Sequence, residues 1–447
     1  MTRRTGLAVA EPLSVVDLFC GAGGLSEGFR QAGFRVSAGS DHDPDALATF
    51  AQNFPEAAAL CGDVRDPGLR EQLYEVAAGV DILIGGPPCQ AFSQVRNHVR
   101  LIEDPRNSLY REFVSTVGAT LPDAFVMENV PGMAQMGVKD QVLSDLSLDG
   151  EYAVEAQVVD AADFGVPQTR KRLLFLGVRR SIATAPPVLA GTGVTSAVQL
   201  SRFASDTGAD FIAGYTLSAS ADNGGDALAS SLADPESTAA VTVKQAIGDL
   251  TGLEAGRRAD ILQTGALPTA RSAYQRLMRT SRGSELSNVS VPRCQRDTAL
   301  RLAAIPAGGN HRDLPEHLKD RYLTGAKWGP SNGSGRLGRS HYYAYRRLHP
   351  DMWAWTLNTK GDSAYHYSAA RSLSVREFAR LQSFPDGFVF TTDPRRGPLP
   401  GRIQGGAAHS RYRQAGNAVP PLLAAAAAAA LRDTLLAARA ASVPISA

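Results

Sequence analysis

Cysteine, net charge and long apolar runs are all scarce in this chain. Its 447 residues include four cysteines, and no two of them form a C-x-x-C pair. The sequence therefore predicts neither a disulfide framework nor a metal site, and a reduced, cytoplasmic setting suits it. No apolar run is long enough to span a bilayer, and the first 12 residues carry two arginines without a long apolar core. We therefore expect a flexible arm at residues 1–12, no signal peptide and no membrane partner.

Charge of either sign is nearly balanced overall, because the formal net charge is only +2. That balance hides an asymmetry, since residues 251–350 hold 17 basic and 7 acidic side chains while the remainder holds 29 and 37. A basic segment in an otherwise acidic chain favours a surface that binds nucleic acid. A solvated basic face with no ligand would show the same excess of basic side chains. Residues 181–240 have one basic and six acidic residues among many small ones, which predicts an acidic surface insertion.

The segment GGPPCQAFS at residues 85–93 follows the apolar run VDILI at 80–84. This order predicts a buried strand, a sharp turn and then Cys89 at the carboxyl end of the strand, where open α/β sheets bind their ligands. Glycines allow the tight turn, and prolines stiffen the backbone after it. A cysteine on such a turn is placed to act as a nucleophile, whereas a free cysteine in isolation is more often a small buried hydrophobic residue.

A glycine-rich turn, DLFCGAGGL at residues 17–25, stands between a strand-like stretch at 13–19 and a helix-like stretch at 25–32. Such a turn lets the backbone approach a nucleotide-like ligand, but its Gly-x-Gly-Gly spacing differs from the dinucleotide fingerprint. The next strand-like stretch ends at Asp41, and Asp63 closes the following unit. A glycine turn and two acids at successive strand ends fit an adenosine-bearing cofactor such as S-adenosylmethionine, although either acid alone fits a helix N-cap equally well.

Apolar periodicity predicts several further elements along the chain. Strands are expected at residues 124–127 and 173–178, and a short strand feeding a short helix at 241–250. Helices are expected at residues 374–383 and at 420–438, which contains seven consecutive alanines. The arginines of the first helix are expected to be structural or to contact the domain junction. Alternation of strands and helices through residues 13–180 is typical of a doubly wound parallel sheet.

Six segments carry a resemblance to a known family. In chain order they are residues 17–24 (DLFCGAGG), 85–93 (GGPPCQAFS), 127–130 (MENV), 168–172 (QTRKR), 371–386 (RSLSVREFARLQSFPD) and 414–421 (QAGNAVPP). With these segments in this order, the chain resembles the DNA cytosine-5 methyltransferases of bacterial restriction-modification systems. The matches are spread through residues 13–180 and 366–421, and residues 181–365 carry no comparable motif.

The resemblance implies an α/β fold with a doubly wound, Rossmann-like domain that binds S-adenosylmethionine. It implies that this catalytic domain is discontinuous, from residues 13–180 and 366–447, because the family's asparagine-bearing segment folds back beside the glycine turn. Residues 241–365 would then form a smaller target-recognition domain that follows the acidic insertion at 181–240. The implied partners are double-stranded DNA and a cognate restriction endonuclease. The implied state is a monomer in the cytoplasm, associated with the nucleoid.

The resemblance also implies a set of catalytic residues. Cys89 would add to C6 of a cytosine that has been flipped out of the duplex, which makes C5 nucleophilic toward a methyl group. Glu128 would act at N3 of the base, Arg170 would donate to its O2, and Arg172 would brace the site or bind phosphate. The spacing Gln168-x-Arg170-x-Arg172 places these side chains on one face of an extended segment.

Nine residues match positions that bind S-adenosylmethionine in the family. They are Phe19, Gly21, Gly23, Asp41, His42, Asp63, Val64, Pro88 and Asn417. The resemblance implies that Asp41 binds the ribose hydroxyls, Asp63 the adenine amino group and Asn417 the methionine moiety. His42 would stack on adenine at a position where the family often has a larger aromatic residue.

Three functions compete at this point. Methylation of C5 of cytosine in a specific duplex DNA sequence, for host protection or epigenetic marking, agrees with all six segments. Methylation of cytosine in RNA is the second, since some relatives of this fold act on transfer RNA, but the long basic stretch favours DNA. A DNA-binding protein without catalysis is the third, and the presence of Cys89, Glu128, Arg170 and Asn417 argues against it.

Overall fold

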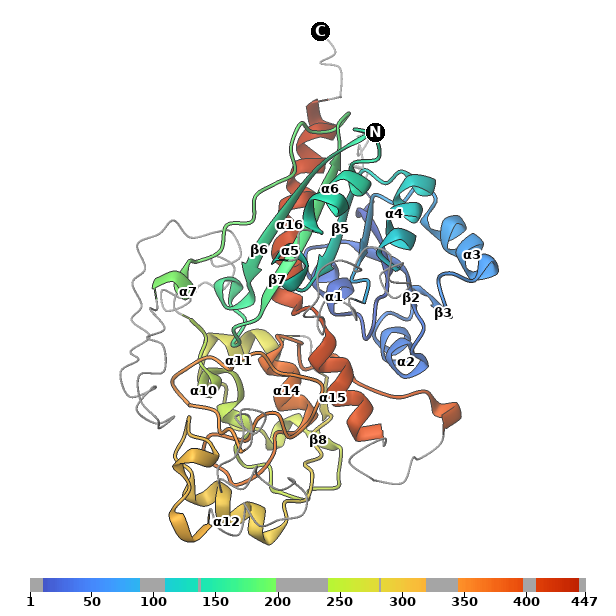
Figure 1. Ribbon diagram of the computed structural model, residues 1–447. Coiled ribbons are helices and arrows are strands. Elements are labelled where there is room, and N and C mark those ends of the chain that lie inside the picture. Colours follow the sequence, from blue (N-terminus) through green and yellow to red (C-terminus); the bar gives the residue numbers. More distant parts are fainter. Residues whose placement is uncertain are drawn as a thin grey trace, which may run out of the picture.

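A computed structural model gives the structure of the chain (Figure 1). It describes residues 11–88, 109–135, 138–197, 240–280, 283–318, 345–396 and 407–441. The predicted nucleophile Cys89 lies outside the described residues. So do residues 1–10 of the predicted arm and residues 198–239 of the predicted acidic insertion.

Seven strands form one central sheet in the order β3-β2-β1-β4-β5-β7-β6. Neighbouring strands from β3 to β5 pair in parallel, which confirms the predicted doubly wound α/β sheet. Strand β7 runs antiparallel to both β5 and β6, a reversal that apolar periodicity does not encode. The strands are β1 (Ser14–Leu18), β2 (Arg35–Asp41), β3 (Ala58–Cys61), β4 (Ile82–Gly85), β5 (Ala124–Asn129), β6 (Tyr152–Asp160) and β7 (Lys171–Arg179).

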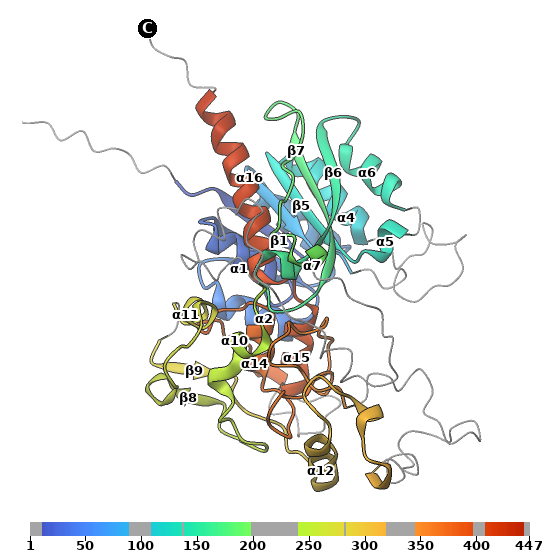
Figure 2. The ribbon, with the colours of Figure 1, turned by 90° about the vertical axis from the view of Figure 1, so that its left-hand side faces the viewer.

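Helices cover both faces of the sheet, so alternate residues of its strands enter two separate apolar clusters. Val15 of β1 packs into one cluster with α1 and α16, and Val16 packs into the other with α3, α4 and α6, as the view in Figure 2 shows. Strands buried on both faces read as continuous apolar runs, which explains their sequences. The helices are α1 (Gly24–Gln31), α2 (Pro44–Asn53), α3 (Pro67–Ala77), α4 (Leu109–Thr120), α5 (Gly132–Gln135), α6 (Lys139–Ser147) and α16 (Pro421–Ala441).

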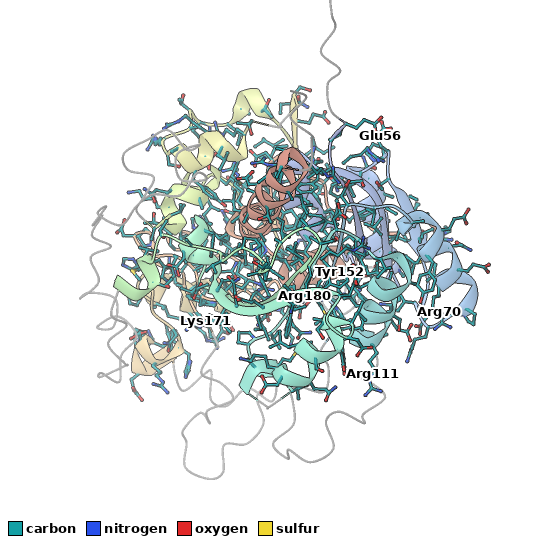
Figure 3. All side chains as sticks on the ribbon, turned by 90° about the horizontal axis from the view of Figure 1, so that it is seen from above. Glu56, Arg70, Arg111, Tyr152, Lys171 and Arg180 are labelled. Carbon is teal, nitrogen blue, oxygen red and sulfur yellow. The ribbon has the colours of Figure 1, made fainter. Side chains whose placement is uncertain are left out.

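The outer helices on the second face are joined to each other at their solvent side. Arg70 of α3 lies 3.6 Å from Glu112 of α4. In Figure 3 the labelled Arg70 and Arg111 extend outward from these two helices, on the opposite side of the molecule from Lys171 at the start of β7. Such half-exposed pairs contribute little to stability, so the apolar cluster beneath them holds this layer in place.

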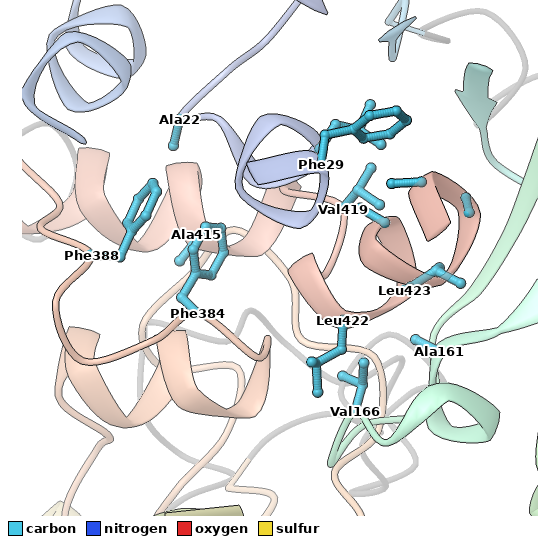
Figure 4. Close-up of a cluster of buried hydrophobic side chains, with 14 of the residues drawn as sticks. Ala22, Phe29, Ala161, Val166, Phe384, Phe388, Ala415, Val419, Leu422 and Leu423 are labelled. Carbon is cyan, nitrogen blue, oxygen red and sulfur yellow. The ribbon is translucent and has the colours of Figure 1, made fainter. Parts of the chain in front are cut away.

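Helix α1 lies directly against α16, and two glycines make the close approach possible. A Cβ atom at Gly28 would lie 2.4 Å from Ala424 Cβ, and one at Gly24 would lie 2.4 Å from the carbonyl oxygen of Val419. The consecutive alanines of α16 have small side chains, which lets the two helix backbones come close together. Figure 4 shows Val419 next to Phe29 of α1 in the resulting cluster. The polyalanine run therefore packs as part of the core.

The same region corrects one prediction about apolar runs. The stretch Ser410–Ala441 is long and apolar enough, by length and composition, to cross a bilayer, although no such run was expected. A core helix passes the same criterion. All residues of α16 from Pro421 to Ala428 are buried in the protein, so we interpret this stretch as a core element.

The elements of residues 240–396 gather below the sheet in Figure 1, and α15 lies beside α14 in this lower group and also contacts α2. Among them β8 and β9 form a two-stranded antiparallel sheet. The elements of this range are α10 (Val243–Ile247), β8 (Ile261–Gln263), α11 (Ala273–Met278), β9 (Glu285–Ser287), α12 (Arg296–Ala304) and α14 (Val375–Leu381). Helix α7 (Val194–Ala197) precedes them in the chain, and α15 (Ala407–Asn417) follows them. Single 3-10 turns occur at Ala161–Phe164, Gly248–Leu250, Thr264–Ala266, His311–Asp313 and Pro394–Arg396.

Most predicted elements are present, and one is wrong. The expected helices at residues 374–383 and 420–438 are α14 and α16. The expected strand at the start of 241–250 does not exist, because Thr242 is the N-cap of α10. Its hydroxyl oxygen accepts from the backbone N–H of Gln245 at 3.2 Å, and the Gln245 side chain accepts in return from the Thr242 N–H. This capping box starts the helix where β-branched residues suggested a strand.

The arginines of α14 are structural, as the sequence predicted. Arg380 pairs with Asp386 at 2.8 Å and with Asp249 at 2.5 Å, and all three side chains are buried. Arg376 donates to the backbone carbonyl of Pro385 at 2.9 Å. Because Asp249 belongs to residues 240–280, the Arg380 network ties these residues to α14, and removing one partner would leave a buried charge uncompensated.

Candidate active site

A cavity of about 730 Å³ opens at the carboxyl ends of the parallel strands. All the predicted site residues that the structure describes line it except one. The lining members are Phe19, Gly21, Asp41, His42, Asp63, Val64, Pro88, Glu128, Arg170, Arg172 and Asn417. The exception is Gly23, and Pro88 is the last described residue before Cys89. Residues separated by as many as 398 positions in sequence thus share one cavity.

The turn between β1 and α1 presents open backbone to the cavity. Gly21 has a φ of 54°, and a Cβ atom there would meet no atom within 4 Å, so this part of the turn leaves room for a ligand. Gly23 has a φ of 93°, and a Cβ atom there would lie 2.6 Å from the ring of Phe54. Gly23 therefore serves the packing of the turn and does not form a wall of the cavity.

The two predicted acids at strand ends are not helix caps. Asp41 accepts from the backbone N–H of Gly21 at 2.9 Å and from that of Asp43 at 2.8 Å, which fixes its carboxylate against the glycine turn. Helix α2 is capped by Asp43 and α3 by Asp66. The N-cap interpretation is therefore wrong for both Asp41 and Asp63.

Asp63 and His42 stand at the open side of the cavity. Arg65 pairs with Asp63 at 2.5 Å, and its hydrogen bonds lower the pKa of Asp63 to about 2. The His42 side chain is 78% exposed, and its Nδ1 lies 3.3 Å from Asp41 Oδ1. That hydrogen bond raises the pKa of His42. Both side chains line a part of the cavity that solvent reaches.

A further carboxyl group lies beneath the glycine turn. Asp17 is fully buried in β1, and its Oδ2 accepts from the Ser26 hydroxyl at 2.6 Å. Its Oδ1 has no hydrogen-bond partner among the described residues, and burial raises the pKa of Asp17 to about 7. Burial, with Asp17 and Asp41 nearby, also raises the pKa of the Cys20 thiol. Cys20 is therefore a neutral thiol and no rival to Cys89 as a nucleophile.

We expect Asp17→Asn to flatten the pH dependence of stability. Because the folded-state pKa of about 7 exceeds the ordinary value of 3.8, the folded chain holds more protons between these values, and stability falls as pH rises through this window. Asparagine does not ionise and still accepts a hydrogen bond from Ser26. In the variant, the slope of the unfolding free energy against pH should therefore lack the contribution of about one proton. Denaturant unfolding from pH 4 to pH 8 measures both slopes. Equal slopes would contradict the assignment.

Glu128 and Arg172 form an ion pair where β5 and β7 lie side by side. Arg172 Nε is 2.6 Å from Glu128 Oε1. Burial raises the pKa of Glu128, and Arg172 and Arg170 oppose that rise. A Cβ atom at Gly86 would lie 3.1 Å from Glu128 Oε2, so the glycine makes room for the carboxyl group. A buried carboxyl with raised proton affinity thus faces the cavity beside the turn that follows β4.

Arg170 lies deeper than the interpretation of its sequence segment suggested. Its side chain is buried, with one terminal nitrogen donating to the carbonyl of Leu357 at 3.0 Å and the other to that of Gly416 at 2.6 Å. Burial lowers the pKa of this guanidinium, and Arg172 lowers it further. Arg170 therefore joins β7 to two later segments of the chain and holds the end of α15, which carries Asn417.

Known proteins with similar sequences identify the chain. The family model for C-5 cytosine-specific DNA methylases matches residues 13–433. The chain belongs to this family. Type II methyltransferase M.AgeI of Thalassovita gelatinovora is 32% identical to this methylase, over 92% of this chain and 97% of its own length. Type II methyltransferase M1.HphI of Haemophilus parahaemolyticus is 30% identical, over 92% of this chain and 84% of its own.

A solved structure shares the fold of this methylase. It is described as a DNA modification methyltransferase encoded within an E. coli prophage, and it aligns with a TM-score of 0.62 at 23% identity, over 95% of this chain and 99% of its own. The resemblance found in the six sequence segments is confirmed, and the protein is a DNA cytosine-5-methyltransferase.

One part of the methylase site had no signal in the sequence. Residues 354–358 run beside the segment that carries Arg170, and the Leu357 N–H donates to Gln168 Oε1 at 2.8 Å. A Cβ atom at Gly416 would lie 2.2 Å from the carbonyl oxygen of Asn358. The sequence AWTLN at 354–358 has no periodicity or motif. Only the glycine before Asn417 hinted that another backbone comes close there.

Proposed function

We propose that this enzyme transfers a methyl group from S-adenosylmethionine to C5 of cytosine within a specific duplex DNA sequence. The observation that carries the proposal is the Glu128–Arg172 pair in the same cavity as Asp41 and the glycine turn. A carboxyl and a guanidinium suit the polar edge of a base, while the turn and Asp41 suit a nucleoside. One cavity therefore holds both reactants in reach of each other.

The cavity fits S-adenosylmethionine in size and in donor set. Its volume of about 730 Å³ lies within the roughly 300–1,000 Å³ of typical small-molecule sites. Asp41 binds the ribose hydroxyls, Asp63 takes the adenine amino group beside Val64, and Asn417 contacts the methionine moiety. Phe19 and the open backbone at Gly21 line the rest. When bound, the sulfonium supplies an electrophilic methyl group, so the protein's task is orientation.

The chemistry at the base is covalent. The Cys89 thiolate adds to C6, which makes C5 an enamine carbon able to attack the methyl group that S-adenosylmethionine would supply, with S-adenosylhomocysteine as the leaving group. A base then removes the C5 proton, and the thiolate leaves to restore the ring. Because C6 is inaccessible inside a duplex, the cytosine is flipped out at a cost of roughly a few kcal/mol. Pro88 forms the wall between the cofactor and the flipped base.

Glu128 and Arg172 stabilise the charge that develops on the ring. The raised pKa of Glu128 supports a protonated carboxyl at N3, where negative charge accumulates after attack on C6. The terminal nitrogens of Arg170 donate to backbone carbonyls, so we assign the hydrogen bond to O2 to Arg172 and a bracing role to Arg170. These assignments exchange the roles expected from the sequence.

The biological setting follows from the substrate and the relatives. The basic stretch at 251–350 supports a DNA-reading surface within a target-recognition domain at residues 241–365, beside a discontinuous catalytic domain. The two relatives named above are Type II methyltransferases, which supports protection of host DNA against a cognate restriction endonuclease. The enzyme then works as a monomer in the cytoplasm, at the nucleoid.

Bisulfite sequencing of plasmid DNA from cells that express the chain tests this function. We expect protected cytosines in one short sequence context with the wild-type chain and none with Cys89→Ala. Soluble wild-type protein that protects no cytosine would overturn the DNA proposal. Bisulfite sequencing of transfer RNA from the same cells would then decide whether RNA is the substrate, because new protected cytosines would appear there.

A further inference from the structure

An ion pair at the wall of the cavity joins two elements that the sequence motifs did not connect. Arg413 of α15 and Asp43 at the start of α2 both line the cavity, and the Arg413 guanidinium lies 2.6 Å from Asp43 Oδ2. Their side chains are 41% and 20% exposed. Neither residue has a role in the proposed chemistry.

Asp43 divides its contacts among three neighbours. One carboxylate oxygen caps α2 by accepting from the Asp45 N–H at 3.1 Å, and the other accepts from Arg413. The backbone N–H of Asp43 donates to Asp41 Oδ1 at 2.8 Å. Arg413 therefore connects, through Asp43, to the carboxylate of Asp41, which we assign to the ribose.

Arg413 is also one helical turn from Asn417. Residues four apart lie on the same face of a helix, and both of these line the cavity. The pair therefore links the start of α2, next to Asp41, to α15, which carries Asn417, at the wall of the cavity.

Buried polar contacts dock α15 on α2 independently of this ion pair. The Thr49 hydroxyl donates to Gln414 Oε1 at 2.6 Å, and the Ser410 hydroxyl donates to Asp45 Oδ2 at 2.8 Å. These contacts lie on the buried side of the interface. Loss of Arg413 should therefore leave α15 docked on α2. It should alter only the positions of the residues on the side of the interface that faces the cavity.

We propose that Arg413 is a positioning residue for the methyl donor, and that its pairing with Asp43 sets the separation of Asp41 and Asn417. The inference rests on the proposed use of S-adenosylmethionine in this cavity. It assigns no contact between Arg413 and the reacting atoms, so cofactor affinity should depend on the pair while the chemical step should not.

Four variants of the full chain separate this role from simple structural support. Arg413→Gln removes the cation, and Asp43→Asn removes the anion while keeping a side chain that caps α2 well. The double variant tests whether the two act as a pair, and Arg413→Lys restores the charge. Arg439→Gln is the matched control, because Arg439 and Asp81 form an ion pair with similar side-chain exposures of 48% and 18%. Asp81 directly precedes β4, so this pair lies at the amino ends of the parallel strands, opposite to the ends where the cavity opens.

Calorimetric titration with S-adenosylhomocysteine and steady-state kinetics supply the readouts. We expect Arg413→Gln and Asp43→Asn each to raise the Kd and the KM for S-adenosylmethionine about fivefold, with kcat within twofold of wild type. The double variant should be no weaker than either single one, because both remove the same interaction. Arg413→Lys should recover most of the affinity, and Arg439→Gln should match wild type.

Three results would overturn the inference. One is an unchanged Kd in Arg413→Gln, and another is losses that add in the double variant. The third is a fall in kcat equal to the rise in KM, which would place Arg413 in the chemical step. Failure of the wild-type chain to bind S-adenosylhomocysteine at all would instead reject the proposed cofactor, and the inference with it.

Discussion

Replacing Glu128 by glutamine should lower kcat by about 10²- to 10³-fold, the range of general acid–base effects. The carboxyl is buried against Arg172, and burial raises its pKa, so a protonated form is available to the ring nitrogen. Glutamine keeps the size of the side chain and one donor group but has no proton to transfer. DNA binding should persist because the cavity walls remain.

The pH dependence distinguishes loss of a proton donor from loss of shape. If the protonated carboxyl acts, wild-type kcat should fall as pH rises through the raised pKa of Glu128, and this limb should be missing in Glu128→Gln. Single-turnover rates from pH 5 to pH 9 measure it. Glu112→Gln is the control and should behave as wild type. Glu112 of α4 lies 3.6 Å from Arg70, and neither residue lines the cavity. A Glu128→Gln variant with wild-type kcat would reject the assignment.

Short motifs located the cavity because the topology brings strand ends together. The glycine turn, Asp63 and Pro88 follow parallel strands, and Asp41 and Glu128 lie in the last two residues of such strands. The carboxyl ends of parallel strands meet at one edge of the sheet. Their convergence in one cavity could therefore be predicted from the order of strands and turns. Asn417 was placed there through the family resemblance alone, since nothing local links α15 to β1.

The partners of the buried side chains could not be predicted. Arg170 has the same local pattern as Arg172, yet one is held by the carbonyls of Leu357 and Gly416 and the other pairs with Glu128. The difference arises from segments about 190 and 250 residues away in sequence, which periodicity does not report. The direction of β7 was likewise open, because an apolar strand buried on both faces reads the same in either direction.

Gly28→Ala should destabilise the protein by about 1–3 kcal/mol, as overpacking of a well-filled interface does. A Cβ atom at this position would lie 2.4 Å from Ala424 Cβ and 2.5 Å from the carbonyl oxygen of Pro421. Much of the obstruction is backbone, so the helices α1 and α16 must separate to admit a methyl group. The gain in helix propensity, about 1 kcal/mol, offsets only part of that cost.

Gly118→Ala provides the matched control for this prediction. Gly118 also lies inside a helix, α4, but its added Cβ atom would be 3.7 Å from the Leu148 side chain, an ordinary contact. This variant should be neutral or more stable by up to about 1 kcal/mol. Urea unfolding of both variants under the same conditions gives the comparison. A Gly28→Ala variant that is as stable as the parent, or more stable, would show that the close approach of α1 to α16 does not require glycine at position 28.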